Sequence, residues 1–148
     1  MEIQCNSERT PMRNYEQIRA KNAYAEKDSI GVAKEGGKAV AKKVPAMIVQ
    51  DGFLGALAFA IEDELDCRKK GKASAYGNVF YGIMKHLPQV KKDFGLCTEV
   101  DLQKFLDKLC NQNADVLRAI TEEAIAYLNY LRRFAKPSKG EENQGNKS

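Results

Sequence analysis

The feature that most constrains this chain is one long helical pattern near its C-terminal end, from Ala119 to Ala135. Apolar residues recur there at intervals of three and four, which places them in one continuous stripe along one side of an α-helix. The stripe consists of Leu117, Ile120, Ala124, Leu128, Leu131 and Ala135, and Val116, Tyr127 and Phe134 widen it. A stripe this wide must be buried against several other helices. Because Pro137 cannot continue a helix, the pattern predicts that the helix ends there.

The rest of the chain shows the same helical spacing, interrupted at glycines and prolines. It predicts helices over residues 11 to about 29, about 40 to 50, 53 to about 68, 74 to about 87, and 98 to about 110. Pro45 lacks a backbone N–H, so the second of these helices should kink or restart there. The pair Asp51-Gly52 predicts a short turn or a local bend, and Gly71 suits the end of the following helix. Thr98 to Asp101 has the form of a capping box that would begin the fifth helix.

No segment alternates apolar and polar residues as a strand does. We therefore predict an all-α fold, a compact bundle of about five or six helices in a single domain over residues 10–136. A chain of 148 residues is long enough to bury the core of one such domain. Residues 1–9 have no periodicity and are predicted to be flexible. Residues 137–148 have no large apolar side chain and are predicted to be disordered.

The most apolar stretch runs from Phe53 to Ile61 and is apolar all round, which is typical of a helix at the centre of a core. We expect Leu57, Phe59 and Leu131 to be core residues. Gly77 and Gly82, in the helix that follows, are expected to allow close packing.

The sequence contains no recognisable catalytic motif, and we predict no catalytic residues, no metal site, no cofactor and no small-molecule substrate. Its single histidine, His86, has no Ser, Cys or Asp partner at a telling spacing, so we expect it to cap a helix end or lie at the surface. The four cysteines form no CxxC pair; they are Cys5, Cys67, Cys97 and Cys110.

A cluster of four acids, at Glu62, Asp63, Glu64 and Asp66, has two interpretations. Such a cluster can bind a divalent cation, or it can form a solvated face. Consecutive positions point in different directions around a helix, which favours the solvated face.

The N-terminus has no signal-peptide pattern, and the apolar run of residues 53–61 is too short to cross a bilayer. Unpaired cysteines are typical of a reducing compartment. We therefore expect a cytoplasmic protein without membrane contact.

The net charge of +4 permits contact with phosphate without requiring it. Basic residues gather near helix ends, at Lys42-Lys43, at residues 68–72, and at Arg132-Arg133 with Lys136. Each cluster is compatible with nucleic-acid binding and with an ordinary solvated helix end, and residues 68–72 fit the solvated end better.

Two stretches resemble one known family. The segment from Thr121 to Ala135 contains Thr-Glu-Glu-Ala and then Tyr-Leu-Asn-Tyr-Leu-Arg-Arg-Phe-Ala, which resembles the closing signature of the Cmr small subunit, the small helical protein of type III-B CRISPR effector complexes. Tyr130 stands where that family usually has Trp. The segment from Val44 to Ala60 resembles the family's Leu-Pro-x-x-Ile, Asn-Gly-Leu and Leu-Ala-Phe pattern, with Asp51 in place of Asn. Val44 and Phe53 each stand where the family has Leu.

The resemblance implies a non-catalytic subunit of an antiviral effector complex. Copies of such a subunit stack along a filament beside other type III-B subunits and contact the CRISPR RNA and its target RNA. The candidate RNA-binding residues are Lys42, Lys43, Arg132, Arg133 and Lys136; only the two arginines match the family motif. The alternative is a helical adaptor that binds protein alone.

Overall fold

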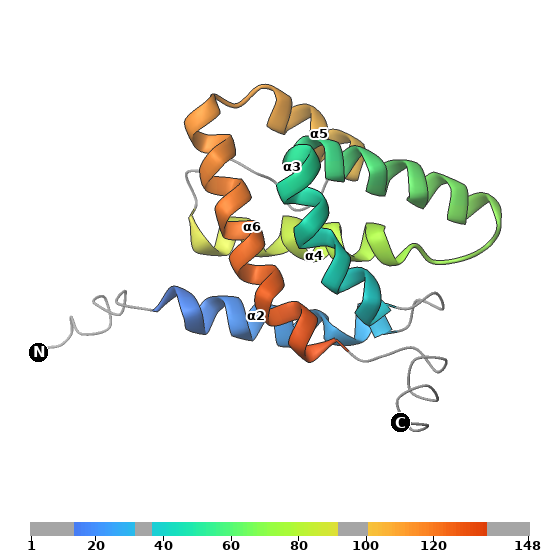
Figure 1. Cartoon of the computed structure of the whole chain (residues 1–148), viewed down its shortest axis with the longest axis horizontal. Helices are drawn as coiled ribbons and strands as arrows, with labels where there is room; N and C mark the ends of the chain where they lie inside the picture. The colour runs from blue at the N-terminus through green and yellow to red at the C-terminus, as the bar shows by residue number, and fades with distance from the viewer. Residues whose placement is uncertain (1–13, 32–36, 92–100, 136–148) are drawn as a thin grey trace, which may run out of the picture.

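A computed structural model of the protein describes residues 14–31, 37–91 and 101–135 (Figure 1). These residues form five helices and no strand. The helices are α2 (Tyr15–Gly31), α3 (Gly37–Lys69), α4 (Ala75–Val90), α5 (Leu102–Cys110) and α6 (Ala114–Phe134). The predicted all-α, single-domain bundle is confirmed. The predicted flexible and disordered ends, residues 1–9 and 137–148, lie outside the described residues, as do Thr98 and the predicted helix start at Pro11.

Helix α6 supplies the centre of the core, as its apolar stripe predicts. It packs against α2, α3 and α4. The side chains that face these three helices are almost completely buried; they are Ile120, Ala124, Tyr127, Leu128 and Leu131, with Ala135 just beyond the helix. The width of the stripe thus corresponds to the number of helices that cover it.

Helix α3 bends at one residue, Gly52, where φ is 84° and ψ is 160°. This backbone conformation is essentially restricted to glycine, so the local bend predicted at Asp51-Gly52 is confirmed. Helix α3 does not restart at Pro45, one of the two outcomes predicted there, because the helix passes through that residue. Val44 and Ile48, on either side of it, are at most 2% exposed, and their burial outweighs the one hydrogen bond that proline cannot donate.

The side chain directly before each of three helices accepts a hydrogen bond from a backbone N–H group in the first turn. Ser74 accepts a hydrogen bond from the N–H of Gly77 at 2.9 Å, Asp101 from that of Lys104, and Asn113 from that of Val116. Asp101 is therefore the N-cap of α5 rather than the third helical residue after an N-cap at Thr98. Gly71 follows α3 with φ of 70°, as predicted for a helix end. Helix α4 continues through Pro88 to Val90, past its predicted end.

By length and composition, α3 is the one described helix apolar enough to cross a membrane. Its most apolar 18 residues have a mean hydropathy of 1.7, and 33% of that window is buried. The sequence prediction considered only the shorter run from residue 53 to 61. The bend at Gly52 and the packing of α3 against α4, α5 and α6 are typical of the core helix of a bundle.

Phe59 is not the core residue that was predicted, because 44% of it is exposed. The buried face of the second half of α3 carries Phe53, Leu57 and Ile61, and Phe59 lies to one side of that line. Its ring packs edge-on against Tyr76 of α4, with ring centroids 5.0 Å apart. An apolar run without periodicity does not indicate which of its residues faces outward.

The close packing predicted at Gly82 occurs against Tyr127. A Cβ atom added at Gly82 would lie 2.7 Å from the phenol oxygen of Tyr127, which is closer than real contacts allow. The phenol is buried and has no hydrogen-bond partner among the described residues. Burial therefore raises the pKa of Tyr127 far above its ordinary value.

We expect Gly82→Ala to lower the free energy of unfolding by about 1–3 kcal/mol, the usual effect of overpacking. In a Tyr127→Phe background the clash is removed, because the next atoms are at least 3.5 Å from the added Cβ. There the better helix propensity of alanine should make the same change neutral or stabilising by up to about 1 kcal/mol. Urea unfolding of the four proteins of this double-mutant cycle measures the coupling. Equal effects of Gly82→Ala in both backgrounds would contradict the contact.

Candidate nucleic-acid interface

The basic residues predicted to contact nucleic acid lie near the ends of two helices. Arg132 and Arg133 occupy the last turn of α6, where Arg133 is exposed and Arg132 is half-buried. Lys42 and Lys43 are both exposed near the beginning of α3. Lys136, the fifth candidate, lies outside the described residues.

The outward direction of Arg133 follows from its register on α6. Leu128 and Leu131 are fully buried. Successive residues of a helix are about 100° apart, so Arg133 projects about 200° away from Leu131. Arg133 is exposed, in agreement with this register. Basic residues in the last turn also interact favourably with the negative end of the helix dipole.

None of these four described cations forms an ion pair with a carboxylate of residues 14–31, 37–91 or 101–135. The basic run that ends α3 differs. Arg68 lies 3.9 Å from Glu64, and Lys70 lies 3.2 Å from Asp66, each one helical turn away. These acids offset the charge of the run, which agrees with its interpretation as a solvated helix end. The four candidate cations keep their charge available for an external anion.

The two candidate clusters come from helix ends on the same side of the bundle. In Figure 1 the red end of α6 and the cyan beginning of α3 both lie near α2, and both helices contact α2. The ring of Tyr24 on α2 meets that of Phe134 on α6 with centroids 5.5 Å apart, which fixes the last turn of α6 on α2. The structure thus brings Arg132-Arg133 and the beginning of α3 to one end of the molecule.

A buried polar network links α2, α4 and α6. Glu123 of α6 receives two hydrogen bonds from the guanidinium of Arg19 on α2, from Nη2 to Oε1 at 2.7 Å and from Nε to Oε2 at 2.8 Å. Oε2 also lies 2.8 Å from Nε2 of His86 on α4. The other ring nitrogen of His86, Nδ1, lies 2.9 Å from the side-chain amide nitrogen of Asn22. One carboxylate therefore connects three helices.

The partners of His86 assign its tautomer. The amide N–H of Asn22 donates to Nδ1, so Nε2 carries the proton and donates to Glu123. The imidazole is buried and stacks on Tyr127, with centroids 4.5 Å apart and planes 21° apart. The expectation of a surface or capping histidine is therefore wrong. It failed because the partners of His86 are 37 and 64 residues away in the chain.

The network also determines the charge state of Glu123. Burial alone would raise the pKa of this carboxyl, but the hydrogen bonds from Arg19 and His86 outweigh burial and hold its pKa below the ordinary value. The same contact with Glu123 raises the pKa of Arg19. The Arg19–Glu123 ion pair is therefore ionised and bidentate. It is largely shielded from water, with the Glu123 side chain 9% exposed.

Comparison with known protein families now bears on the chain as a whole. The profile of the CRISPR-associated protein family Cas_Cmr5 matches residues 15–137. The chain belongs to this family, that of the Cmr small subunit. The match spans all five described helices and both segments on which the sequence resemblance rests. A comparison with curated proteins finds no match.

The core of this Cmr small subunit includes Leu57 and Leu131 of the two motif segments, since both are fully buried. Tyr130, at the position where the family usually has Trp, is half-buried. Its pKa is raised, mainly by burial and in smaller part by a hydrogen bond with Glu16. The motif thus contributes to the packing of α6 against α2.

Sequence reasoning missed Glu123, although a signal was present. The residue lies three positions after Ile120 and four before Tyr127, which places it inside the apolar stripe of this Cmr small subunit. A carboxylate at such a position requires a buried cation or hydrogen-bond donors. Its cation, Arg19, is 104 residues away in the chain. The acid therefore could have been found from α6 alone, but its partners could not.

The acid cluster of α3 diverges, as its spacing indicated. Asp63 accepts a hydrogen bond from the hydroxyl of Ser74 at 2.7 Å, while Glu64 and Asp66 face bases on the next turn. The thiol of Cys67 donates to Asp63 at 3.6 Å. Burial and this neighbouring acid raise the pKa of Cys67, so its thiol is a poorer nucleophile than a free cysteine.

Proposed function

We propose that this protein is a non-catalytic small subunit of a type III-B CRISPR effector complex that contacts the target RNA and its duplex with the guide. Its copies stack along the filament beside other type III-B subunits in antiviral defence in the cytoplasm. The RNA contacts are made by Lys42, Lys43, Arg132, Arg133 and Lys136. Membership of the Cmr small-subunit family supports this role.

The observation that carries the RNA contact is a set of three exposed cations and the half-buried Arg132 at one end of the bundle, none of them paired with an acid of the described residues. Phosphate oxygens are the natural counter-charge of such groups, and contacts of this kind give affinity without reading sequence. The buried link from Arg19 through Glu123 to His86 holds α2, α4 and α6 in fixed positions. A rigid arrangement of this kind lowers the entropy cost of binding an extended strand.

The non-catalytic role has support from the histidine. His86 is buried and uses both ring nitrogens in hydrogen bonds to Asn22 and Glu123, so it is not available as a general base. No cofactor and no small-molecule substrate enter the proposal.

A protein-only adaptor is the second candidate. Its support is the set of apolar side chains that α3 leaves exposed, with Val49 at 75%, Phe59 at 44% and Leu65 at 41%. Such side chains fit contacts with other subunits. They suit both candidates, whereas the cations that pair with no acid of residues 14–31, 37–91 or 101–135 favour RNA.

The RNA contact is tested with a double variant that combines Arg132→Ala and Arg133→Glu. We expect target-RNA capture by the assembled complex to weaken about tenfold or more, because charge-assisted hydrogen bonds to phosphate are lost. The loss should be similar for unrelated RNA sequences, and affinity should depend less steeply on salt. Electrophoretic mobility shifts at several salt concentrations measure both effects.

The matched control is Arg68→Ala with Lys70→Glu, which changes the charge by the same amount at the end of α3. Because these bases already face Glu64 and Asp66, the control should leave capture nearly unchanged. Equal losses in both double mutants would indicate a general charge effect. An arginine-pair variant that assembles and captures RNA normally at every salt concentration would reject this pair as the RNA surface, and Lys42 and Lys43 would be tested next.

A further inference from the structure

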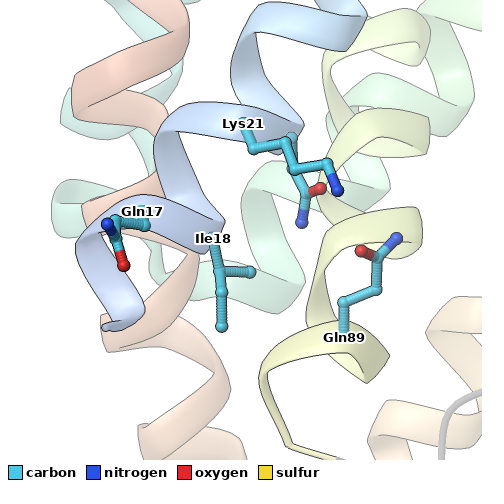
Figure 2. Close-up of a pocket in the computed structure, with 5 residues that line it drawn as sticks. Gln17, Ile18, Lys21 and Gln89 are labelled. Atoms are coloured by element: carbon cyan, nitrogen blue, oxygen red, sulfur yellow. The ribbon is translucent and has the colours of Figure 1, made fainter. Parts of the chain in front are cut away.

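A polar pocket lies between α2 and α4, beside the network of Glu123. Its volume is about 180 Å³, and it is lined by Gln17, Ile18, Lys21, Asn22 and Gln89. Figure 2 shows the side chains of Lys21 and Gln89 pointing toward one another across the space between the two helices, with Ile18 beside that space, below Lys21 and to the left of Gln89. A second hollow of about 100 Å³ shares Asn22 and Gln89 and continues toward Lys85. Together they form a groove along the α2–α4 contact, called here the amide groove.

The polar groups of the amide groove have unused hydrogen-bonding capacity. The amide of Asn22 donates to His86, and this bond leaves its oxygen free to accept. Within the described residues, the Gln89 amide makes one long contact, 3.5 Å to the carbonyl of Lys85. Lys21 forms no ion pair within the described part of the chain. The groove thus offers amide donors, amide acceptors and one cation.

This combination does not favour a simple anion. Amide oxygens repel an anion, and the carboxylate of Glu26 lies in the same groove, already paired with Lys85 at 2.7 Å. A planar ring with donors and acceptors on its edge fits better. Asn and Gln side chains pair with the edges of nucleobases, and the buried Ile18 provides an apolar surface for the face of a ring. Pockets that hold drug-sized ligands have volumes of about 300–1,000 Å³. The volume of this pocket is smaller, which suits a single base.

A basic and aromatic path connects this groove to the proposed RNA surface. Tyr24 is 57% exposed and lies one turn after Lys21 on α2. The ammonium of Lys27 lies 4.4 Å from the centre of the Tyr24 ring, and the same ring meets Phe134, the neighbour of Arg133. Three residues of α2 correspond to about 4.5 Å along the helix axis. A strand held by the arginine pair therefore needs to follow α2 for only a short distance to reach Lys21.

We propose that the amide groove receives one unstacked base of a single-stranded segment of the bound RNA. Gln89 and Asn22 hydrogen-bond to the edge of the base, Ile18 lies against its face, and Lys21 contacts the phosphate that enters with it. Tyr24 and Lys27 guide the strand between the arginine pair and the groove. This inference rests on the proposed RNA contact and adds a second kind of contact, to the base instead of the phosphate.

The experiment compares two short single-stranded RNAs of equal length and charge with the purified full chain at low salt. One RNA carries all its bases, and the other carries abasic positions throughout its central part. Fluorescence anisotropy measures both affinities. We expect the abasic RNA to bind about fivefold more weakly or worse, the size of one good base contact. The variant Gln89→Ala should remove that difference and leave the salt dependence unchanged, because it removes no charge.

The matched control is Gln103→Ala, an exposed glutamine on α5 away from the groove, which should retain the full difference. Circular dichroism and melting temperature check that both variants fold. Equal binding of the two RNAs to the wild type, or a Gln89→Ala variant that keeps the difference, overturns the inference while leaving the phosphate contacts intact. If neither RNA binds, the proposed RNA contact itself fails, and the inference fails with it. If Gln89→Ala leaves RNA binding unchanged but impairs assembly with the other subunits, the groove binds protein instead.

Discussion

Replacing Glu123 with alanine is expected to lower the free energy of unfolding by about 3–5 kcal/mol, the usual cost of breaking a buried ion pair from one side. The change removes the carboxylate that accepts hydrogen bonds from the guanidinium of Arg19 and from the Nε2–H of His86. Both donors are then left without this acceptor. Urea unfolding followed by circular dichroism measures the loss. The matched control is Glu122→Ala, one position earlier, because Glu122 is exposed and its removal should change stability by less than about 0.5 kcal/mol. Similar effects at both positions would show that the network does not hold the three helices together.

The same carboxylate predicts a direction for the pH dependence. The pKa of Glu123 is lower in the folded protein than its ordinary value, so the folded state favours the ionised form. Its contribution is complete above the unfolded pKa, about 4.3, and is lost as pH falls through the lower folded pKa. Below about pH 4 the melting temperature of the wild type should therefore fall more steeply than that of Glu123→Gln, which cannot titrate. Parallel curves would contradict the ionised pair.

Leu131→Ala is expected to lower the free energy of unfolding by about 2–5 kcal/mol, as truncation of a buried leucine does. Leu131 is fully buried on α6, a helix that packs against α2, α3 and α4, so little can move to fill the space. Chemical unfolding measures the change. Val49→Ala is the comparison, since Val49 is 75% exposed and its truncation should cost less than about 0.5 kcal/mol. A loss below about 1 kcal/mol at Leu131 would mean that the core of α6 is loosely packed.

The parts of this fold that the sequence predicts well are those with periodic burial. The stripe of α6 recurs over five turns, so Leu131 and Arg133 could be placed on opposite sides without any coordinates. The bend at Gly52 was predictable because a glycine interrupts an otherwise continuous pattern. The run that contains Phe59 was not, because a segment that is apolar all round carries no phase.

The candidate site was only partly predictable, for a different reason. The four described cations were found from their types and positions, but only the structure could show that no acid among the described residues pairs with them. His86, Asn22 and Glu123 meet across three helices, and a pairing between residues tens of positions apart leaves no local pattern. The amide groove is similar, since Lys21 and Gln89 become neighbours only when α2 packs on α4.

The bend in α3 has a mechanical consequence. A straight helix of 33 residues would extend about 50 Å, but the turn at Gly52 folds it so that Phe53, just after the bend, meets Phe80 of α4 and Phe105 of α5. Two separate helices would need a linker whose residues add freedom between them. Here the single residue Gly52 connects the two segments, or arms, of α3, and packing against the other helices holds both arms in place. Lys43 on the first arm and Phe59 on the second are therefore held at a fixed separation. A displacement of one of these surfaces would also displace the other.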